Sequence, residues 1–117
     1  MNSERVSTEP TFDIRRLGDD AVLVALGGEH DLASAPQLAS TLEEVLRSCR
    51  HLFVDISTAD FFDSTAISAL VAAKTRAEKN GQRFNLVIDS APQVARILEI
   101  MGVLDVLNPV RTAAEVS

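Results

Sequence analysis

One sequence feature constrains the fold of this chain most: an unbroken apolar run that leads into an amphipathic helix pattern. The run covers residues 22–26, and a strand without polar alternation is typical of a sheet that is covered on both faces. Behind it, apolar residues recur at helical spacing from Ala35 to Cys49. A buried strand followed by a helix is the repeating unit of an α/β fold.

The same alternation continues to the end of the chain. Ser34 and Gln37 have the spacing of a capping box, and their Ser-Ala-Pro-Gln run recurs at 90–93. Repeated strand–helix–strand units favour parallel pairing through right-handed crossovers. We predict strands at 12–17, 21–27, 52–56 and 84–88, helices that begin at Ser34, Ser64 and Ser90, and a short strand near Val110.

The predicted architecture is an α/β fold with a mixed, mostly parallel sheet of four to five strands and helices packed on it. Gly18-Asp19-Asp20 joins the first two strands as an N-terminal hairpin. In the third helix we expect four apolar side chains to face inward: Val94, Ile97, Leu98 and Met101. Residues 1–11 are polar and are expected to be a disordered leader, and 12–117 are expected to form a single domain.

Composition excludes several classes of protein. The net charge is −6, and phosphate contacts need clustered Lys and Arg, so we expect no nucleic-acid partner. No apolar run reaches the length of a membrane span. The N-terminus lacks the apolar core of a signal peptide, and the single cysteine, Cys49, cannot form an internal disulfide. We therefore expect a cytoplasmic protein without membrane contact.

A metal site and other cofactors are not expected either. The two histidines, His30 and His51, lie at opposite ends of adjacent predicted strands, roughly 17 Å apart. They are therefore too distant to share a metal ion. Asp55 has the position of a receiver-domain phosphoacceptor, but the only lysines, Lys74 and Lys79, fall on the second helix. We interpret Asp55 as a structural strand residue.

Two loops follow the carboxyl ends of predicted strands, where α/β sheets gather their functional residues. The first is Gly28–Asp31, and the second runs from Ser57 to Asp63 into the helix that starts at Ser64. Taken alone, a serine after an aspartate at a helix start is interpreted as a helix cap.

Three stretches together give the chain a family resemblance. They are residues 28–32 with Ser34-Ala35-Pro36, residues 61–65 followed by Ile67 and Leu70, and residues 90–94 running to Leu98 and 101–103. At this spacing the chain resembles the STAS family, the anti-sigma factor antagonists of bacterial partner-switching systems. The resemblance covers residues 12–116 and implies the STAS fold.

The resemblance also implies a function in transcription regulation. The unphosphorylated form would bind an ATP-dependent anti-sigma factor serine kinase and release the sigma factor. Phosphorylation on Ser64 would switch binding off, and a PP2C-type phosphatase would reverse it. The chain itself would not be an enzyme, and we expect a monomer or weak dimer.

The resemblance implies that Asp31 and Asp63 meet the kinase, and we expect the neighbouring residues Glu29, His30 and Thr65 to join them. A phosphate on Ser64 would lie near the positive end of a helix dipole and add about −1.5 to −2 charge beside Asp63. We therefore expect a binding switch that leaves the fold intact.

One residue departs from the family. Ala66 stands where the family usually has glycine. We expect it to stiffen the helix start and to present a methyl group that crowds the partner.

Two alternatives stay open. The chain could be a STAS scaffold subunit of a stress-signalling or lipid-transport assembly, in which Ser64 is only a helix cap. A Ser–His–Asp hydrolase would use Ser64, His30 and Asp31, but residues 62–66 lack the glycines of a nucleophile elbow.

Overall fold

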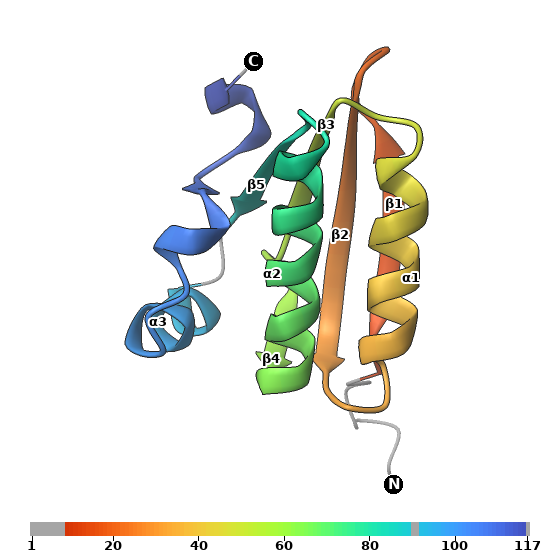
Figure 1. Cartoon of the computed structure of the whole chain (residues 1–117). Coiled ribbons are helices and arrows are strands. Elements are labelled where there is room, and N and C mark those ends of the chain that lie inside the picture. The colour runs from red at the N-terminus through yellow and green to blue at the C-terminus, as the bar shows by residue number, and fades with distance from the viewer. Residues whose placement is uncertain (1–8, 90–91, 117) are drawn as a thin grey trace, which may run out of the picture.

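The computed structural model describes residues 9–89 and 92–116 (Figure 1). Of the predicted leader, residues 1–8 lie outside this part, and Thr11 already belongs to the first strand. The elements in chain order are β1 (Thr11–Arg16), β2 (Ala21–His30), α1 (Ala35–Leu46), β3 (His51–Asp55), β4 (Ala59–Phe62), α2 (Ser64–Lys79), β5 (Arg83–Val87), α3 (Pro92–Ile100), the short 3-10 helix η2 (Asp105–Leu107), β6 (Pro109–Val110) and the 3-10 helix η3 (Ala113–Val116).

The strands form one mixed sheet in the order β1-β2-β3-β5-β6, with β4 paired to β2. β1 and β2 are antiparallel and form the predicted hairpin, whereas the pairs β2–β3, β3–β5 and β5–β6 are parallel. The α/β class and the mostly parallel sheet are therefore confirmed. The sheet has six strands in the described residues, more than the four to five that we predicted.

β4 is the strand that the sequence analysis missed, since we predicted a loop from Ser57 to Asp63. It pairs in parallel with the last residues of β2, which extends to His30 rather than ending at Gly27. β3 and β4 thus follow one another beside β2, with an irregularity where Thr58 accepts a hydrogen bond from the Gly28 amide. Gly28 has φ 73°, which favours glycine and permits the register shift at this point.

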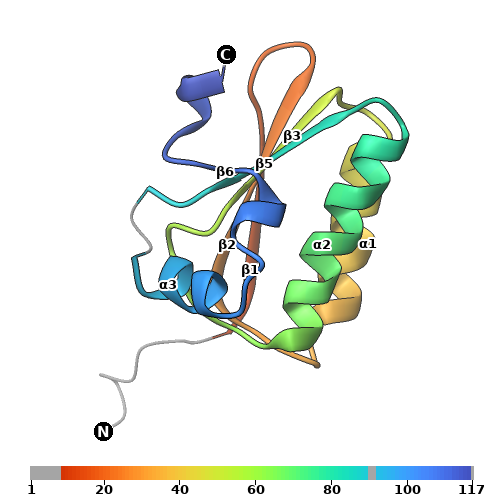
Figure 2. The ribbon, with the colours of Figure 1, turned by 60° about the vertical axis from the view of Figure 1, so that its left-hand side comes forward.

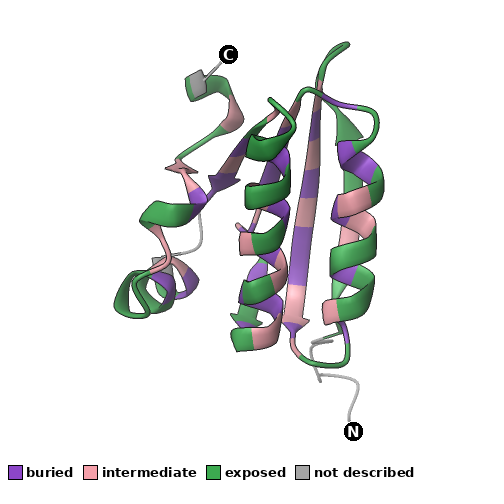
Figure 3. Ribbon diagram, viewed as in Figure 1, coloured by how far each residue is buried: buried purple, intermediate pink, exposed green. Residues whose placement is uncertain are grey.

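The core lies between one face of the sheet and the helices α1 and α2, which run side by side on that face (Figures 1 and 2). Burial alternates along the first part of β2 (Figure 3), so one row of its side chains faces the helices. The core side chains of these elements include Val22, Val24 and Leu26 of β2, Leu38 and Leu42 of α1, and Ile67 and Leu70 of α2.

α1 differs from its prediction at both ends. It stops at Leu46, although Cys49 beyond it is still buried. At its start, Ser34 makes no side-chain cap hydrogen bond, so the predicted capping box is wrong there. The serine hydroxyl is used elsewhere, as described below.

α3 lies on the other side of the sheet from α1 and α2 (Figure 2) and packs next to β4. Val94 and Leu98 are buried as predicted, but Ile97 and Met101 are 42% and 47% exposed and do not face the core. The second Ser-Ala-Pro-Gln cap begins at residues 90 and 91, which lie outside the described residues. Within the described part, no helix is both long and apolar enough to span a bilayer.

Candidate partner-binding site

The two candidate loops meet at the carboxyl ends of β2 and β4. The Asp63 amide donates a hydrogen bond to the His30 carbonyl over 3.0 Å, and the Leu32 amide donates to Asp63 Oδ2, also over 3.0 Å. We refer to the surface made by residues 29–34 and 61–65 as the rim. Residues separated by about thirty positions thus form one surface.

Asp63 is the residue that joins the two halves of the rim. Its Oδ1 accepts hydrogen bonds from the amides of Thr65 (2.9 Å) and Ala66 (3.0 Å) and from the Thr65 hydroxyl (2.6 Å). The Thr65 hydroxyl, followed by the Ala66 amide, lowers the pKa of Asp63 below its usual value. Asp63 is thus the N-cap of α2. It is ionised at neutral pH, and both of its carboxylate oxygens are engaged within the chain.

Ser64 is the first residue of α2 and is exposed. Thr65 beside it is half-buried, and its hydroxyl donates to Asp63. Within the part of the chain that the structure describes, the Ser64 hydroxyl makes no hydrogen bond. Of the two adjacent hydroxyls, that of Ser64 is therefore the one on an exposed residue and without a hydrogen bond to the described residues. Because Asp63 caps the helix, the interpretation of Ser64 as the cap is wrong.

His30 lies beneath the rim and is fully buried. Its Nε2 donates to the Gly27 carbonyl over 3.0 Å. Burial lowers the pKa of the imidazole, which favours the neutral ring. In a neutral ring that donates from Nε2, Nδ1 is the acceptor, and it lies 3.3 Å from the Ser34 hydroxyl, which donates to it. The rings of Phe12 and Phe62 meet the imidazole edge-on, with centroids 5.2 and 5.3 Å away. The prediction that His30 touches a partner is therefore corrected, since this side chain supports the rim from below.

Glu29 and Asp31 lie on the first half of the rim and are both half-buried. Asp31 Oδ1 accepts from the Ala33 amide over 3.0 Å and so shapes the turn before α1. Both acids line a hollow of about 300 Å³, together with Glu9, Pro10, Ala33, Ser34 and Gln37. The structure thus brings these two predicted residues together in an acidic hollow, which favours a basic group from a partner.

Comparison with models of known protein families identifies the family of this chain. A family model described as "Mlab, STAS domain" matches residues 15–109, which is most of the chain. The chain belongs to the STAS domain family. No curated protein matches this STAS domain significantly.

Solved structures share its fold. An anti-sigma factor antagonist from Mycobacterium paratuberculosis has 22% identity and a TM-score of 0.81, with 94% of this chain and 92% of that chain covered. The unphosphorylated form of the anti-sigma factor antagonist SpoIIAA has 16% identity and a TM-score of 0.72, with 91% and 92% covered. The phosphorylated form of the Bacillus cell fate determinant SpoIIAA has 15% identity and a TM-score of 0.66, with 91% and 96% covered.

The sequence analysis did not predict that two apolar side chains of the rim are exposed. Leu32 is 70% exposed and Phe61 is 42% exposed, whereas Phe62 is buried against His30. The Phe61-Phe62 pair held a usable signal, because successive residues of a strand point to opposite faces. Nothing in the pattern around Leu32 marked it as exposed.

Ala66 does not behave as we expected. It is fully buried in the core of the STAS domain, and its amide donates to Asp63. The prediction that its methyl group crowds a partner is therefore wrong, because that methyl group is covered by the chain's own side chains.

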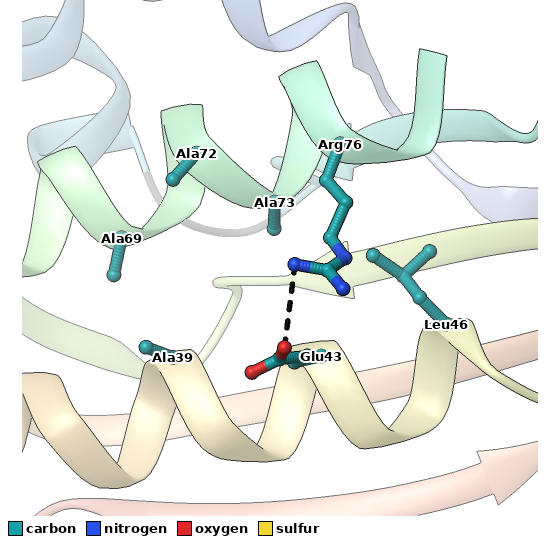
Figure 4. Close-up of a pocket in the computed structure, with 7 residues that line it drawn as sticks. All are labelled: Ala39, Glu43, Leu46, Ala69, Ala72, Ala73 and Arg76. Carbon is teal, nitrogen blue, oxygen red and sulfur yellow. Dashed lines mark ion pairs between the residues drawn. The ribbon is translucent and has the colours of Figure 1, made fainter. Parts of the chain in front are cut away.

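A second hollow, of about 150 Å³, lies between α1 and α2 and away from the rim (Figure 4). Arg76 and Glu43 span it with an ion pair of 3.3 Å. Its other lining residues are Ala39, Leu46, Ala69, Ala72 and Ala73. The alanines allow the two helices to approach closely, and the hollow contains none of the predicted site residues. Among the described residues, no three His, Cys, Asp or Glu side chains cluster as a metal site would need.

Proposed function

We propose that this STAS domain is an anti-sigma factor antagonist controlled by phosphorylation of Ser64. Its unphosphorylated form binds an anti-sigma factor serine kinase in the cytoplasm and frees the sigma factor. The observation that carries the proposal is the exposed hydroxyl of Ser64 at the start of α2, which makes no hydrogen bond to the described residues. Its two neighbours are hydrogen-bonded to each other, because the Thr65 hydroxyl donates to Asp63. Solved SpoIIAA structures in unphosphorylated and phosphorylated forms support it as a precedent on the same fold.

In the proposed reaction the chain is the substrate and the kinase supplies catalysis. A base of the kinase removes the Ser64 hydroxyl proton, and Oγ attacks the γ-phosphorus of ATP as the bond to ADP breaks. The chain's contribution is position: the Asp63 cap fixes the first turn of α2, so Ser64 is presented on a rigid helix start. A PP2C-type phosphatase hydrolyses the phosphate and restores the binding form.

The switch then follows from charge. The phosphate adds about −1.5 to −2 charge beside the ionised Asp63 and on the same rim as Glu29 and Asp31. The helix start tolerates this charge, because the helix dipole favours anions at its N-terminus. A partner interface does not, since repulsion and the desolvation of a dianion both oppose close contact.

The rim also indicates the chemistry of the partner surface. The acidic hollow at Glu29 and Asp31 favours basic groups, and the exposed Leu32 and Phe61 favour an apolar patch beside them. Asp63 contributes indirectly, because it holds Leu32 in place through the Leu32 amide. Thr65 contributes through its bond to Asp63.

The test uses the anti-sigma factor kinase, captured from a lysate of the source cell with the immobilised, unphosphorylated chain as bait. The captured kinase is then used to phosphorylate the chain. With ATP, mass spectrometry should find one phosphate, on Ser64, and Ser64→Ala should abolish it. Thr65→Ala is the matched control: it also removes one hydroxyl, but one that is already hydrogen-bonded within the chain, so labelling should persist. Label that remains in Ser64→Ala would overturn the assignment.

A second candidate keeps the fold and changes the function. The matching family model is described as "Mlab, STAS domain", and membership of this family is equally compatible with a scaffold subunit of a stress-signalling or lipid-transport assembly. In that case Ser64 is an ordinary exposed helix residue, since Asp63 already caps α2. Capture of a multi-subunit assembly without a kinase, together with unmodified Ser64 in cells, would favour this candidate.

A further inference from the structure

β1 is the outermost strand of the sheet, and its outer edge is unpaired among the described residues. The Leu17 amide donates to the Ala21 carbonyl, and the β1–β2 register continues from that pair. Hydrogen-bonded pairs alternate along an antiparallel ladder. Asp13 and Arg15 therefore direct their main-chain groups toward β2. Three residues, Phe12, Ile14 and Arg16, direct theirs outward.

We propose that this edge binds the β1 strand of a second copy, in an antiparallel pair with Ile14 opposite Ile14. Outward-directed residues must face one another for the main chains to bond, so only alternate registers are possible. With Ile14 at the two-fold axis, Asp13 of each copy lies opposite Arg15 of the other. Sliding the strands by two residues places Asp13 opposite Asp13 or Arg15 opposite Arg15, which is repulsive. Charge therefore selects one register.

The side chains suit that register on both faces of the strand. Asp13 and Arg15 already form an exposed ion pair of 3.0 Å within β1. In the dimer they occupy positions without main-chain bonds between the copies, where opposing side chains are closest. Ile14 points to the other face and is 54% exposed. Ile14 of the second copy would cover this side chain, which otherwise exposes an apolar group on a sheet edge.

The ends of β1 limit the pairing to residues 12–16. The next outward position on one side is Pro10, which has no amide hydrogen to donate. On the other side the chain turns at Gly18, with φ 94°. Three hydrogen-bonded residue pairs remain, or about six main-chain bonds. An interface of this size predicts a reversible dimer.

The helices leave room for the second copy. α1 packs on β2 and β3, and three strand spacings, about 14 Å, separate the β2 strands of the two copies. That spacing exceeds the 8–10 Å at which helices pack. β4 lies on the opposite side of β2 from β1. The inference is therefore independent of the proposed function of the rim.

Charge reversal tests the interface by sedimentation equilibrium of the full chain over a range of concentrations. The wild type should dimerise reversibly, and Arg15→Asp and Asp13→Arg should each weaken dimerisation at least tenfold. An equimolar mixture of these two variants should form a heterodimer, because each Arg then faces an Asp. The double variant Asp13→Arg/Arg15→Asp should dimerise like the wild type.

Arg111→Asp is the matched control, since it makes the same charge change next to β6 at the far edge of the sheet and should leave dimerisation unchanged. Circular dichroism melting curves establish that each variant is folded. A wild type that stays monomeric to about 1 mM would overturn the proposal, as would a dimer that survives either single reversal. Failure of the two variants to associate on mixing would also contradict the register.

Discussion

The replacement His30→Ala should destabilise the fold strongly, although His30 lies beside the proposed binding surface. It removes two edge-on contacts with Phe12 and Phe62, each worth about 0.5–1.5 kcal/mol beyond burial. It also removes two hydrogen bonds, to Gly27 and Ser34, worth about 1 kcal/mol each. The cavity left by a buried ring adds to these losses, so we expect a loss of at least about 4 kcal/mol, or roughly 15 °C or more in melting temperature for a domain of this size.

Urea and thermal unfolding followed by circular dichroism measure this loss. Hydrogen exchange adds a local readout, because the Leu32 amide should exchange faster once the rim loses its support. Leu32→Ala is the neighbouring control: its side chain is 70% exposed, so its stability should change by less than about 0.5 kcal/mol. A His30→Ala variant that melted within about 5 °C of the wild type would refute the supporting role that we give this ring.

Three further predictions follow from the same contacts. Burial lowers the pKa of His30 below 6.5, so the folded state binds fewer protons than the unfolded state. The free energy of unfolding should therefore be highest above pH 6.5 and fall at lower pH. Urea midpoints at pH 7.5 and 5.5 measure this fall, which should be smaller in His30→Phe. Asp63→Asn keeps an oxygen that caps α2 but loses the acceptor for the Leu32 amide. Hydrogen exchange at Leu32 should become faster and the rate of phosphorylation should change while the helix persists; unchanged rates would count against the role of Asp63 in joining the two halves of the rim. Ser64→Glu should shift the melting temperature by less than about 4 °C, since acids are tolerated at helix starts. It should nevertheless weaken kinase binding at least tenfold, as measured by calorimetry. If the variant is unfolded, its loss of binding is due to misfolding and the switch argument fails.

The elements with strong periodicity were predictable from the sequence. The apolar run at 22–26 and the helical spacing after Ser64 each report burial along one segment, and both elements occur near their predicted bounds. The helix start at Ser64 was predictable in the same way, because a helix start has a local signature. These features depend on neighbours within a few residues, which sequence patterns record. The roles of Ser64 and Asp63 toward a partner came from the family resemblance and stay predictions.

The remaining features depend on contacts between distant segments. β4 has only four residues, and its pairing with β2 requires a shift at Gly28 that no local pattern encodes. Ser34 has the sequence of a cap, but the buried His30 nitrogen competes for its hydroxyl. His30 itself lies in a loop-like sequence and is buried because Phe12 and Phe62 close over it from two other strands.

The most direct test of the proposed switch is a calorimetric titration of the anti-sigma factor kinase with the chain in two forms, unmodified and stoichiometrically phosphorylated on Ser64. Asp31→Asn, in the unmodified form, measures the contribution of the acidic hollow, expected at about 1–3 kcal/mol of binding free energy. We predict that the unmodified chain binds and that phosphorylation weakens binding at least a hundredfold with the melting curve preserved. Equal affinity of the two forms would contradict the switch.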